Sequence, residues 1–201
     1  MKIYIGSDHR GSDRSVSEGR PAASGSETAV GTTRINNMRI FIGADHRGFK
    51  LKEDIKKYFY ENGIESEDLG AYELDPKDDY PIYAERVAQK VSVEIKNANA
   101  SAQRALARRE ARGILLCGSG VGVDIVANKF EHIRSGLGIN TEQVTSARKD
   151  DDINVLAIAA DETSENEARE MVKAFLETEF EPSEKHTRRL NEIEEIEKES
   201  S

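Results

Sequence analysis

The sequence is poor in cysteine, tryptophan and long apolar runs, and each absence removes a class of protein. Among 201 residues there is one cysteine, Cys117, and no tryptophan. A single thiol excludes an internal disulfide and a zinc site built from several thiolates. No apolar run approaches the roughly 18 residues of a spanning helix, and the amino terminus lacks the apolar stretch of a secretory signal. We therefore expect a soluble, cytoplasmic protein with no membrane contact.

The chain also lacks an excess of positive charge. It carries 29 basic and 38 acidic residues, which gives a formal net charge of −9. Because the phosphate backbone of a nucleic acid demands a basic surface, we expect no nucleic-acid partner. The length suits one ordinary domain with an appendage, and such a domain buries a core without disulfides or structural metals.

The amino-terminal segment repeats. Residues 1–11, MKIYIGSDHRG, return as residues 38–48, MRIFIGADHRG, with eight of eleven positions identical. Only the second copy continues into an apolar pattern with helical spacing. Residues 12–37 are rich in Ser, Gly, Thr and Ala, and they have too few large apolar side chains for burial to offset the entropy lost on ordering. We expect a duplicated start and linker over 1–37 and one domain over 38–201. A strand that competes with or caps the sheet, in its own chain or another, is the alternative for the first copy.

From residue 38 onward, short apolar runs alternate with amphipathic segments, which is typical of a parallel sheet covered by helices. The predicted strands are 39–43, 65–69, 113–117, 133–139 and 153–159. The predicted helices are 46–61, 82–112, 123–130, 141–149, 164–178 and 183–198. Together they predict an α/β fold with a five-stranded parallel sheet, a doubly wound three-layer sandwich of Rossmann-like or flavodoxin-like type. Such sheets bind ligands at the carboxyl ends of their strands.

The strongest motif is GILLCGSGVGVDIVANKF, residues 113–130, in which a strand runs through a glycine-rich loop into a helix. Glycines let the backbone approach a ligand, and N–H groups at the start of a helix bind a phosphate or an enediolate oxygen. The partial positive charge of these N–H groups also favours the thiolate form of Cys117, which can act as a base or a nucleophile. A buried, inert cysteine is the alternative. The spacing G-x-G-x-G is not the G-x-G-x-x-G of dinucleotide sites, and Asn140 stands where a ribose-binding acid would be, so we expect no nucleotide cofactor.

A second motif is IGADHRGF, residues 42–49, which puts Asp45 and His46 at the end of the first predicted strand. There, a carboxylate and an imidazole can position hydroxyl groups or bind an anion. The alternative is that Asp45 caps the following helix and that His46 is solvated.

Four segments together resemble the type B ribose 5-phosphate isomerase and galactose 6-phosphate isomerase family. They are MRIFIGADHRGFKLKEDI (38–55), DDYPIYA (78–84), GILLCGSGVGVDIVANKF (113–130) and KHTRR (185–189). The resemblance covers residues 38–198 and implies an aldose–ketose isomerase of a small sugar phosphate that needs neither a metal nor a cofactor. It also implies a homodimer, or a dimer of dimers, with active sites shared across the dimer interface.

The resemblance assigns roles to individual residues. It makes Cys117 the base that moves a proton between C1 and C2 through an enediolate, and it makes Ser119 the hydroxyl that contacts the sugar. The other implied contacts to substrate and phosphate are Asp45, His46, Tyr80, Gly118, Gly120, Val121, Gly122, Asp151, Lys185 and Arg189.

The chain departs from the family pattern in three places. Asp150 and Asp151 stand where the family commonly has His-Asn, so a carboxylate replaces the histidine proposed to open the sugar ring; Asp150 could act as the base for that step. Asp161 stands where many members have an arginine. Lys185 stands where the family usually has a phosphate-binding arginine, and a lysine cannot form the two parallel hydrogen bonds of a guanidinium. If they face the site, the added aspartates repel a phosphate. A catalytically altered or inactive sugar-binding or structural subunit, or an isomerase of a different sugar, is therefore the alternative.

Overall fold

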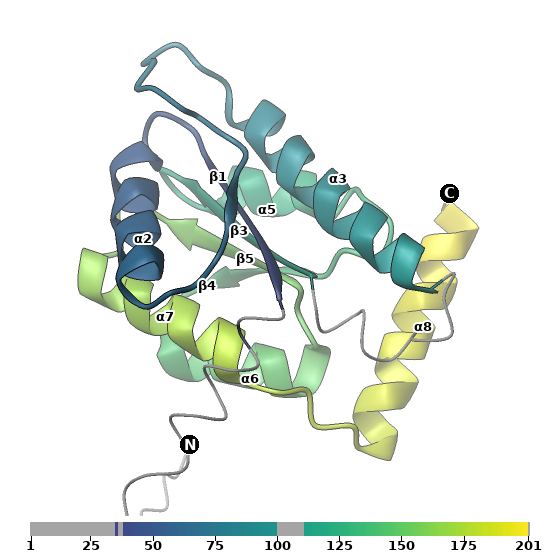
Figure 1. The fold of residues 1–201 in the computed structure, drawn as a ribbon. Coiled ribbons are helices and arrows are strands. Elements are labelled where there is room, and N and C mark those ends of the chain that lie inside the picture. Colours follow the sequence, from purple (N-terminus) through teal and green to yellow (C-terminus); the bar gives the residue numbers. More distant parts are fainter. Residues whose placement is uncertain (1–34, 36–37, 100–110, 201) are drawn as a thin grey trace, which may run out of the picture.

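The computed structural model describes residues 35, 38–99 and 111–200, which form a parallel sheet between two layers of helices (Figure 1). The strands are β1 (Arg39–Ala44), β2 (Glu67–Asp68), β3 (Ala111–Cys117), β4 (Ser135–Gly138) and β5 (Val155–Ala159). The helices are α2 (Phe49–Glu61), α3 (Tyr80–Asn99), α5 (Val121–Ala127), α6 (Thr141–Asp151), α7 (Glu165–Glu177) and α8 (Glu184–Ser200). None of these helices is both long enough and apolar enough to cross a membrane.

All neighbouring strands are parallel, in the order β2-β1-β3-β5-β4. This confirms the predicted five-stranded, doubly wound sheet. The order differs from the flavodoxin order 2-1-3-4-5 in that β5 lies between β3 and β4. The chain reverses its winding direction between β1 and β3, so the carboxyl ends of these two strands flank the place where such sheets bind ligands.

Alternating residues of the central strands fill two separate apolar layers. In β3, all of whose residues are buried, Ile114 and Leu116 pack with α2, α6 and α7, whereas Leu115 and Cys117 pack with α3 and α5. The same helices cover the two faces in Figure 1. Because the side-chain period of a strand is two, a strand buried on both faces is apolar throughout, which is why this strand was recognisable in the sequence.

The start of α2 lies directly against the end of β3. A Cβ atom at Gly48 would come within 2.6 Å of the carbonyl oxygen of Leu116. Only glycine permits this approach, which brings the residues that precede α2 beside the last residues of β3.

The predicted strands agree with the observed ones to within a few residues, but the predicted helix over 82–112 is wrong at its end. Helix α3 ends at Asn99, and residues 111 and 112 begin β3. Residues 100–110 lie outside the described residues, as does the duplicated start apart from Ile35. That residue is 7% exposed and packs in the layer of α2 and α7. The division at residue 37 stays a prediction.

A buried ion pair ties α2 to the loop after β2. Lys52 is fully buried, and its Nζ donates to Asp68 Oδ1 at 2.8 Å, to Oδ2 at 2.9 Å and to the carbonyl of Ala71. Asp68 also accepts from Lys56 at 2.6 Å and from the N–H of Gly70 at 2.9 Å. Burial alone would raise the pKa of Asp68, but these donors outweigh it and lower the pKa.

Asp68→Asn is expected to destabilise the fold by about 3 kcal/mol at pH 7, because it removes the nearest counter-charge of the buried Lys52 ammonium and leaves only Glu53 at 3.5 Å. The folded pKa of Asp68 lies below its unfolded value, so its contribution is present in full above the unfolded pKa and is lost as the pH falls through the folded pKa. Urea unfolding at pH 7 and pH 3 should show the difference between variant and wild type shrinking in acid.

The control is Glu61→Gln, which removes an exposed pair with Lys57 at 3.8 Å and should cost less than about 0.5 kcal/mol. A loss for Asp68→Asn as small as this control would contradict a stabilising role for the buried pair.

Candidate functional site

The carboxyl ends of β1, β3 and β5 meet at one edge of the sheet. Ala44 lies opposite Leu116, and Cys117 lies opposite Ala159. The backbone N–H of Asp45 continues the ladder by donating to the carbonyl of Leu116 at 3.3 Å. Parallel pairing thus brings the two predicted motifs side by side, although 72 positions separate Asp45 from Cys117 in the sequence.

Cys117 ends β3 and is 4% exposed. The loop that follows is held by two hydrogen bonds from the β5 side, because the N–H groups of Ala160 and Asp161 donate to the carbonyls of Cys117 and Gly118 at 2.9 and 3.1 Å. In the part of the chain that is described, the N–H groups of Ser119 and Gly120 donate to no other residue. They are donors available to a ligand beside the thiol.

Gly120 has φ = 72° and caps α5. A Cβ atom there would lie 2.9 Å from the N of Ala159, so both the backbone conformation and the close approach require glycine. Next to it, Val121 and Ser119 are exposed. The ring of Tyr80, 39% exposed, rests on Gly122, where a Cβ would come within 2.7 Å of Cζ. Tyr80 therefore lies against the glycine loop, and its contact with a substrate stays a prediction.

Asp45 is 5% exposed and serves the backbone. Its Oδ1 accepts from the N–H groups of Arg47 and Gly48 at 3.0 and 2.9 Å. The alternative that Asp45 caps the following helix is therefore wrong in its detail: Asp45 binds N–H groups of the turn before α2, and the N-cap of α2, Gly48, has no side-chain cap. The carboxylate fixes the path of the chain past the end of β3.

His46 is hydrogen-bonded rather than merely solvated. Its Nδ1 lies 2.6 Å from Oδ1 of Asp78, and its backbone N–H donates to the same oxygen at 3.0 Å. The Asp78 side chain is 6% exposed, and the His46 side chain is 30% exposed. We did not predict Asp78 as a site residue; its only sequence signal was its place next to the Asp-Tyr-Pro segment.

Arg47 was also missed. Its guanidinium lies against Gly118 and forms an ion pair with Asp161, with 56% and 37% of the two side chains exposed. Asp161 thus does reach the edge of the sheet near Cys117, but a cation compensates its charge. The repulsion that Asp161 alone would exert on an anion is reduced accordingly.

The remaining predicted residues lie elsewhere in the chain. Asp150 and Asp151 are exposed in the last turn of α6, and Lys185 and Arg189 are exposed on α8. His186 Nε2 lies 3.6 Å from Asp150 Oδ1, which places the start of α8 beside the end of α6. Among the described residues, Lys185 and Arg189 form no ion pair.

Topology puts this second group at the opposite edge of the sheet. The end of α6 leads into Val155, the first residue of β5, whereas Cys117 pairs with Ala159, its last residue. Strand β5 alone spans about 13 Å between these two positions. Within one chain, the structure therefore brings together Cys117, the glycine loop, Asp45, His46 and Tyr80, and separates them from the cluster on α6 and α8.

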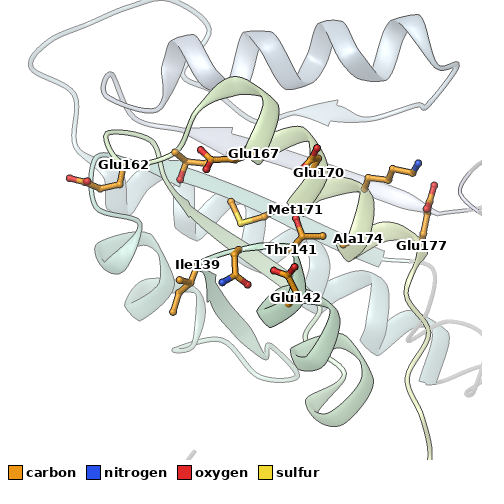
Figure 2. A pocket seen from close by; sticks show the side chains of 12 residues that line it. Ile139, Thr141, Glu142, Glu162, Glu167, Glu170, Met171, Ala174 and Glu177 are labelled. Atoms are coloured by element: carbon orange, nitrogen blue, oxygen red, sulfur yellow. The ribbon is translucent and has the colours of Figure 1, made fainter. Parts of the chain in front are cut away.

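A separate hollow of about 580 Å³ lies between α6 and α7 (Figure 2). Glutamate carboxylates surround it; they belong to Glu142, Glu162, Glu167, Glu170 and Glu177. With Lys173 as the basic residue of the lining, the hollow is acidic overall, and its charge opposes an anionic ligand. The described residues contain no group of three or more His, Cys, Asp and Glu side chains placed to hold a metal ion.

The fold and the carboxyl edge define a doubly wound α/β protein with a thiol and free backbone donors where such proteins bind ligands. The sequence of residues 40–193 matches the ribose/galactose isomerase family, and the chain belongs to that family. The probable ribose-5-phosphate isomerase B of Mycoplasma pneumoniae is 35% identical over 73% of this chain and 86% of its own. The ribose-5-phosphate isomerase B of Escherichia coli K12 is 33% identical over 75% and 90%.

Two further relatives bear on the substrate. The ribose-5-phosphate isomerase B of Mycoplasma genitalium, solved with bound ribulose-5-phosphate, superimposes with a TM-score of 0.71 at 34% identity, over 81% of this chain and 97% of that one. The D-erythrulose-4-phosphate isomerase of Pectobacterium atrosepticum is 35% identical over 65% of this chain and 77% of its own. The relatives thus include isomerases of different sugar phosphates.

Gly120→Ala is expected to lower the free energy of unfolding by about 3 kcal/mol, because it adds a contact with β5 to the strain of a positive φ. Gly63→Ala is the matched control: its φ is 65°, but nothing lies within 4 Å of the added carbon, so it should cost about 1 kcal/mol. Equal losses in urea unfolding would show that the close approach at Gly120 does not matter.

Proposed function

We propose that this protein interconverts a small aldose phosphate and the corresponding ketose phosphate, in the manner of a ribose 5-phosphate isomerase, with Cys117 as the base. The observation that carries the proposal is the place of the thiol: it ends β3, near Asp45 and beside the N–H groups of Ser119 and Gly120, which have no acceptor among the described residues. Membership of the ribose/galactose isomerase family supports it.

In this proposal, the Cys117 thiolate removes the proton from C2 of the open-chain aldose and returns it to C1. The negative charge that develops on the carbonyl oxygen is held by the N–H groups of the loop, which are fixed before the substrate arrives and cost no reorganisation. The Ser119 hydroxyl contacts the sugar, and Tyr80 borders the site. No step needs a metal or a cofactor.

The same proposal accounts for the distance between the two groups of residues. A phosphate bound by Lys185 and Arg189 cannot belong to a sugar at Cys117 of the same chain, since the sheet separates them. A homodimer that brings the α8 cations of one protomer to the Cys117 edge of its partner completes the site and places Asp150 and Asp151 in it. Both cations are exposed and form no ion pair with any residue that the structure describes, which favours this arrangement.

A sugar-phosphate-binding subunit without catalysis is the second candidate. It is favoured by Asp150, which stands where a catalytic histidine is common, and by the ion pair that already engages Arg47. The two candidates differ in proton chemistry, because a binding subunit leaves the C–H bonds of the sugar intact.

Cys117→Ala is expected to lower kcat about 10³-fold, because it removes the group that transfers the proton. The measurement is isomerisation of ribose 5-phosphate and ribulose 5-phosphate in D₂O, with deuterium incorporation at C1 and C2 followed by NMR. A panel of shorter and unphosphorylated sugars tests the substrate class. Alkylation should inactivate the wild type, and substrate should protect it; the reaction is unambiguous because the chain has one thiol.

Full activity of Cys117→Ala, or of the completely alkylated protein, would remove the thiol from the mechanism. No exchange with any sugar, despite binding, would favour the subunit without catalysis. Ser119→Ala is the comparison within the same loop: it should reduce activity less than Cys117→Ala, since the N–H donors remain.

Mixed dimers test the shared site. Cys117→Ala and a Lys185→Ala/Arg189→Ala double variant should each be nearly inactive alone. Coexpressed with different tags in equal amounts, they should recover about a quarter of wild-type activity, because half of the dimers are mixed and each has one intact site. Absence of recovery in purified mixed dimers would place all site residues within one chain.

A further inference from the structure

Arg47 lies against the loop that follows Cys117, yet it has no part in the function proposed above. A Cβ atom at Gly118 would come within 2.5 Å of Nε and 2.7 Å of Nη1 of Arg47, so the guanidinium rests on this glycine. Gly118 directly follows the thiol in the chain. A cation is therefore in contact with the residue next to Cys117.

Contacts at both ends of the side chain fix this guanidinium. Asp45 Oδ1 accepts from the backbone N–H groups of Arg47 and Gly48, which fixes the point where the side chain starts. At the far end, Nη2 donates to Oδ2 of Asp161. Asp161 also donates its backbone N–H to the carbonyl of Gly118 at 3.1 Å. Arg47, Gly118 and Asp161 thus contact one another in a closed triangle at the carboxyl ends of β1, β3 and β5.

The guanidinium has N–H donors that the protein does not use. The ion pair with Asp161 engages Nη2, and within the described part of the chain Nε and Nη1 donate to no residue. The Arg47 side chain is 56% exposed, so a ligand can reach it. A planar guanidinium with several free donors matches the geometry of a phosphate group. An exposed pair with a single carboxylate is weak, so it does not prevent a second anion from binding.

Arg47 also borders a hollow of about 650 Å³ between α2 and the start of α7, which reaches the residue after β5. Its charged lining consists of three cations and one carboxylate, namely Arg47, Lys50, Arg169 and Glu165. Lys50 lies 3.2 Å from Glu165, and Arg169 donates through Nε to Asp54 at 2.7 Å. This hollow is therefore basic, in contrast to the acidic one between α6 and α7, and Arg47 is its cation nearest to the Cys117 loop.

The two sides of the end of β3 differ in chemistry. The Cys117 side chain belongs to the layer of α3 and α5, whereas the basic hollow lies between α2 and α7, on the other face of the sheet. An open-chain sugar with its carbonyl end at Cys117 can extend across the end of β3 toward Arg47. The end of the sugar that carries the phosphate then meets the cation.

We infer that Arg47 binds the phosphate group of the substrate. The inference rests on the proposed function for the identity of the ligand, a small sugar phosphate, and adds a phosphate contact from the same chain that supplies Cys117. A phosphate monoester carries nearly two negative charges at pH 7, so a cation partly compensated by Asp161 cannot neutralise it alone. Lys185 and Arg189 of a partner protomer, in the homodimer proposed above, supply the remaining positive charge.

The inference also gives a reason for the departure at position 161. Many family members have an arginine there, whereas here that position holds a carboxylate that pairs with an arginine from the turn after β1. The guanidinium is thus kept at this edge of the sheet, and it comes from residue 47 instead of residue 161.

Arg47→Gln is expected to weaken the binding of ribose 5-phosphate and of inorganic phosphate about 30-fold, because it removes charge-assisted hydrogen bonds. The affinity for unphosphorylated ribose should change less than about threefold, since that ligand has no group for Arg47. Calorimetric and ³¹P NMR titrations measure the dissociation constants. In steady-state assays the loss should appear in KM for ribose 5-phosphate, with kcat changed less than about threefold. Arg47→Lys should recover part of the affinity, because it keeps the charge and loses the fork.

Asp161→Asn separates a ligand contact from a merely structural ion pair. This variant removes the pair but leaves the guanidinium in place, and it also removes a carboxylate that competes with the phosphate. The inference requires it to bind inorganic phosphate at least as tightly as the wild type does. Equal losses of phosphate affinity in Asp161→Asn and Arg47→Gln would show that only the pair matters, and would overturn the inference.

Arg39→Gln is the matched control. Arg39 is the first residue of β1, at the opposite end of that strand, and its exposed guanidinium pairs with Glu94 at 2.7 Å. The variant loses the same charge and the same kind of exposed pair, so it should leave phosphate binding and KM unchanged. Urea unfolding of both arginine variants should give midpoints close to that of the wild type, which ensures that folded proteins are compared.

The inference and the proposed function can fail separately. Unchanged phosphate binding in Arg47→Gln would overturn the inference, while isomerisation that depends on Cys117 would leave the proposed function standing. An equal loss of kcat for phosphorylated and unphosphorylated sugars would place Arg47 at the reacting carbons, and would overturn it as well. If the wild type isomerises no sugar but loses phosphate affinity in Arg47→Gln, the proposed function fails and the phosphate contact stands.

Discussion

The parallel pairing of β1, β3 and β5 is the constraint on which the site depends. Parallel strands bring all their carboxyl ends to one edge, so Asp45, Cys117 and Ala160 become neighbours although they are far apart in the sequence. Two glycines allow close contacts with the backbone of these strands: Gly48 lies against Leu116 of β3, and Gly120 lies against Ala159 of β5. They let α2 and α5 start where the strands stop, and the turns before both helices therefore border the same space.

Ion pairs compensate the buried charges of this acidic chain and link elements that are distant in the sequence. Lys52 and Asp68 join α2 to β2, and Arg148, fully buried, donates to Asp152 at 2.8 Å below the ring of Phe175. A buried charge is tolerated only with a partner and further hydrogen bonds, and both cations have them. These contacts fix the loop after β2 and the turn between α6 and β5 against the helices that cover the sheet.

The elements could be predicted from the sequence because their signals are local. Strand β3 is apolar throughout and α2 has helical spacing, and both were recognised. The end of α3 was not, since the Ala and Arg residues near position 111 favour a helix, while pairing with β1 makes Ala111 and Arg112 a strand. The contacts of Asp78 with His46 and of Asp161 with Arg47 could not be predicted, because they join residues 32 and 114 positions apart that share no periodic pattern. Only the folded sheet brings them together.

Those two contacts change the meaning of the family departures. Read as residue types, Asp150 and Asp161 remove an imidazole and a guanidinium and add two negative charges. In the structure, Arg47 compensates the charge of Asp161, so the change in local charge at the Cys117 edge is smaller than that substitution implies. At position 150 the resemblance implies the loss of an imidazole, and Asp150 itself lies exposed in the last turn of α6. The imidazole in the turn after β1 is that of His46, and its contact with Asp78 fixes its orientation at the carboxyl edge of the sheet.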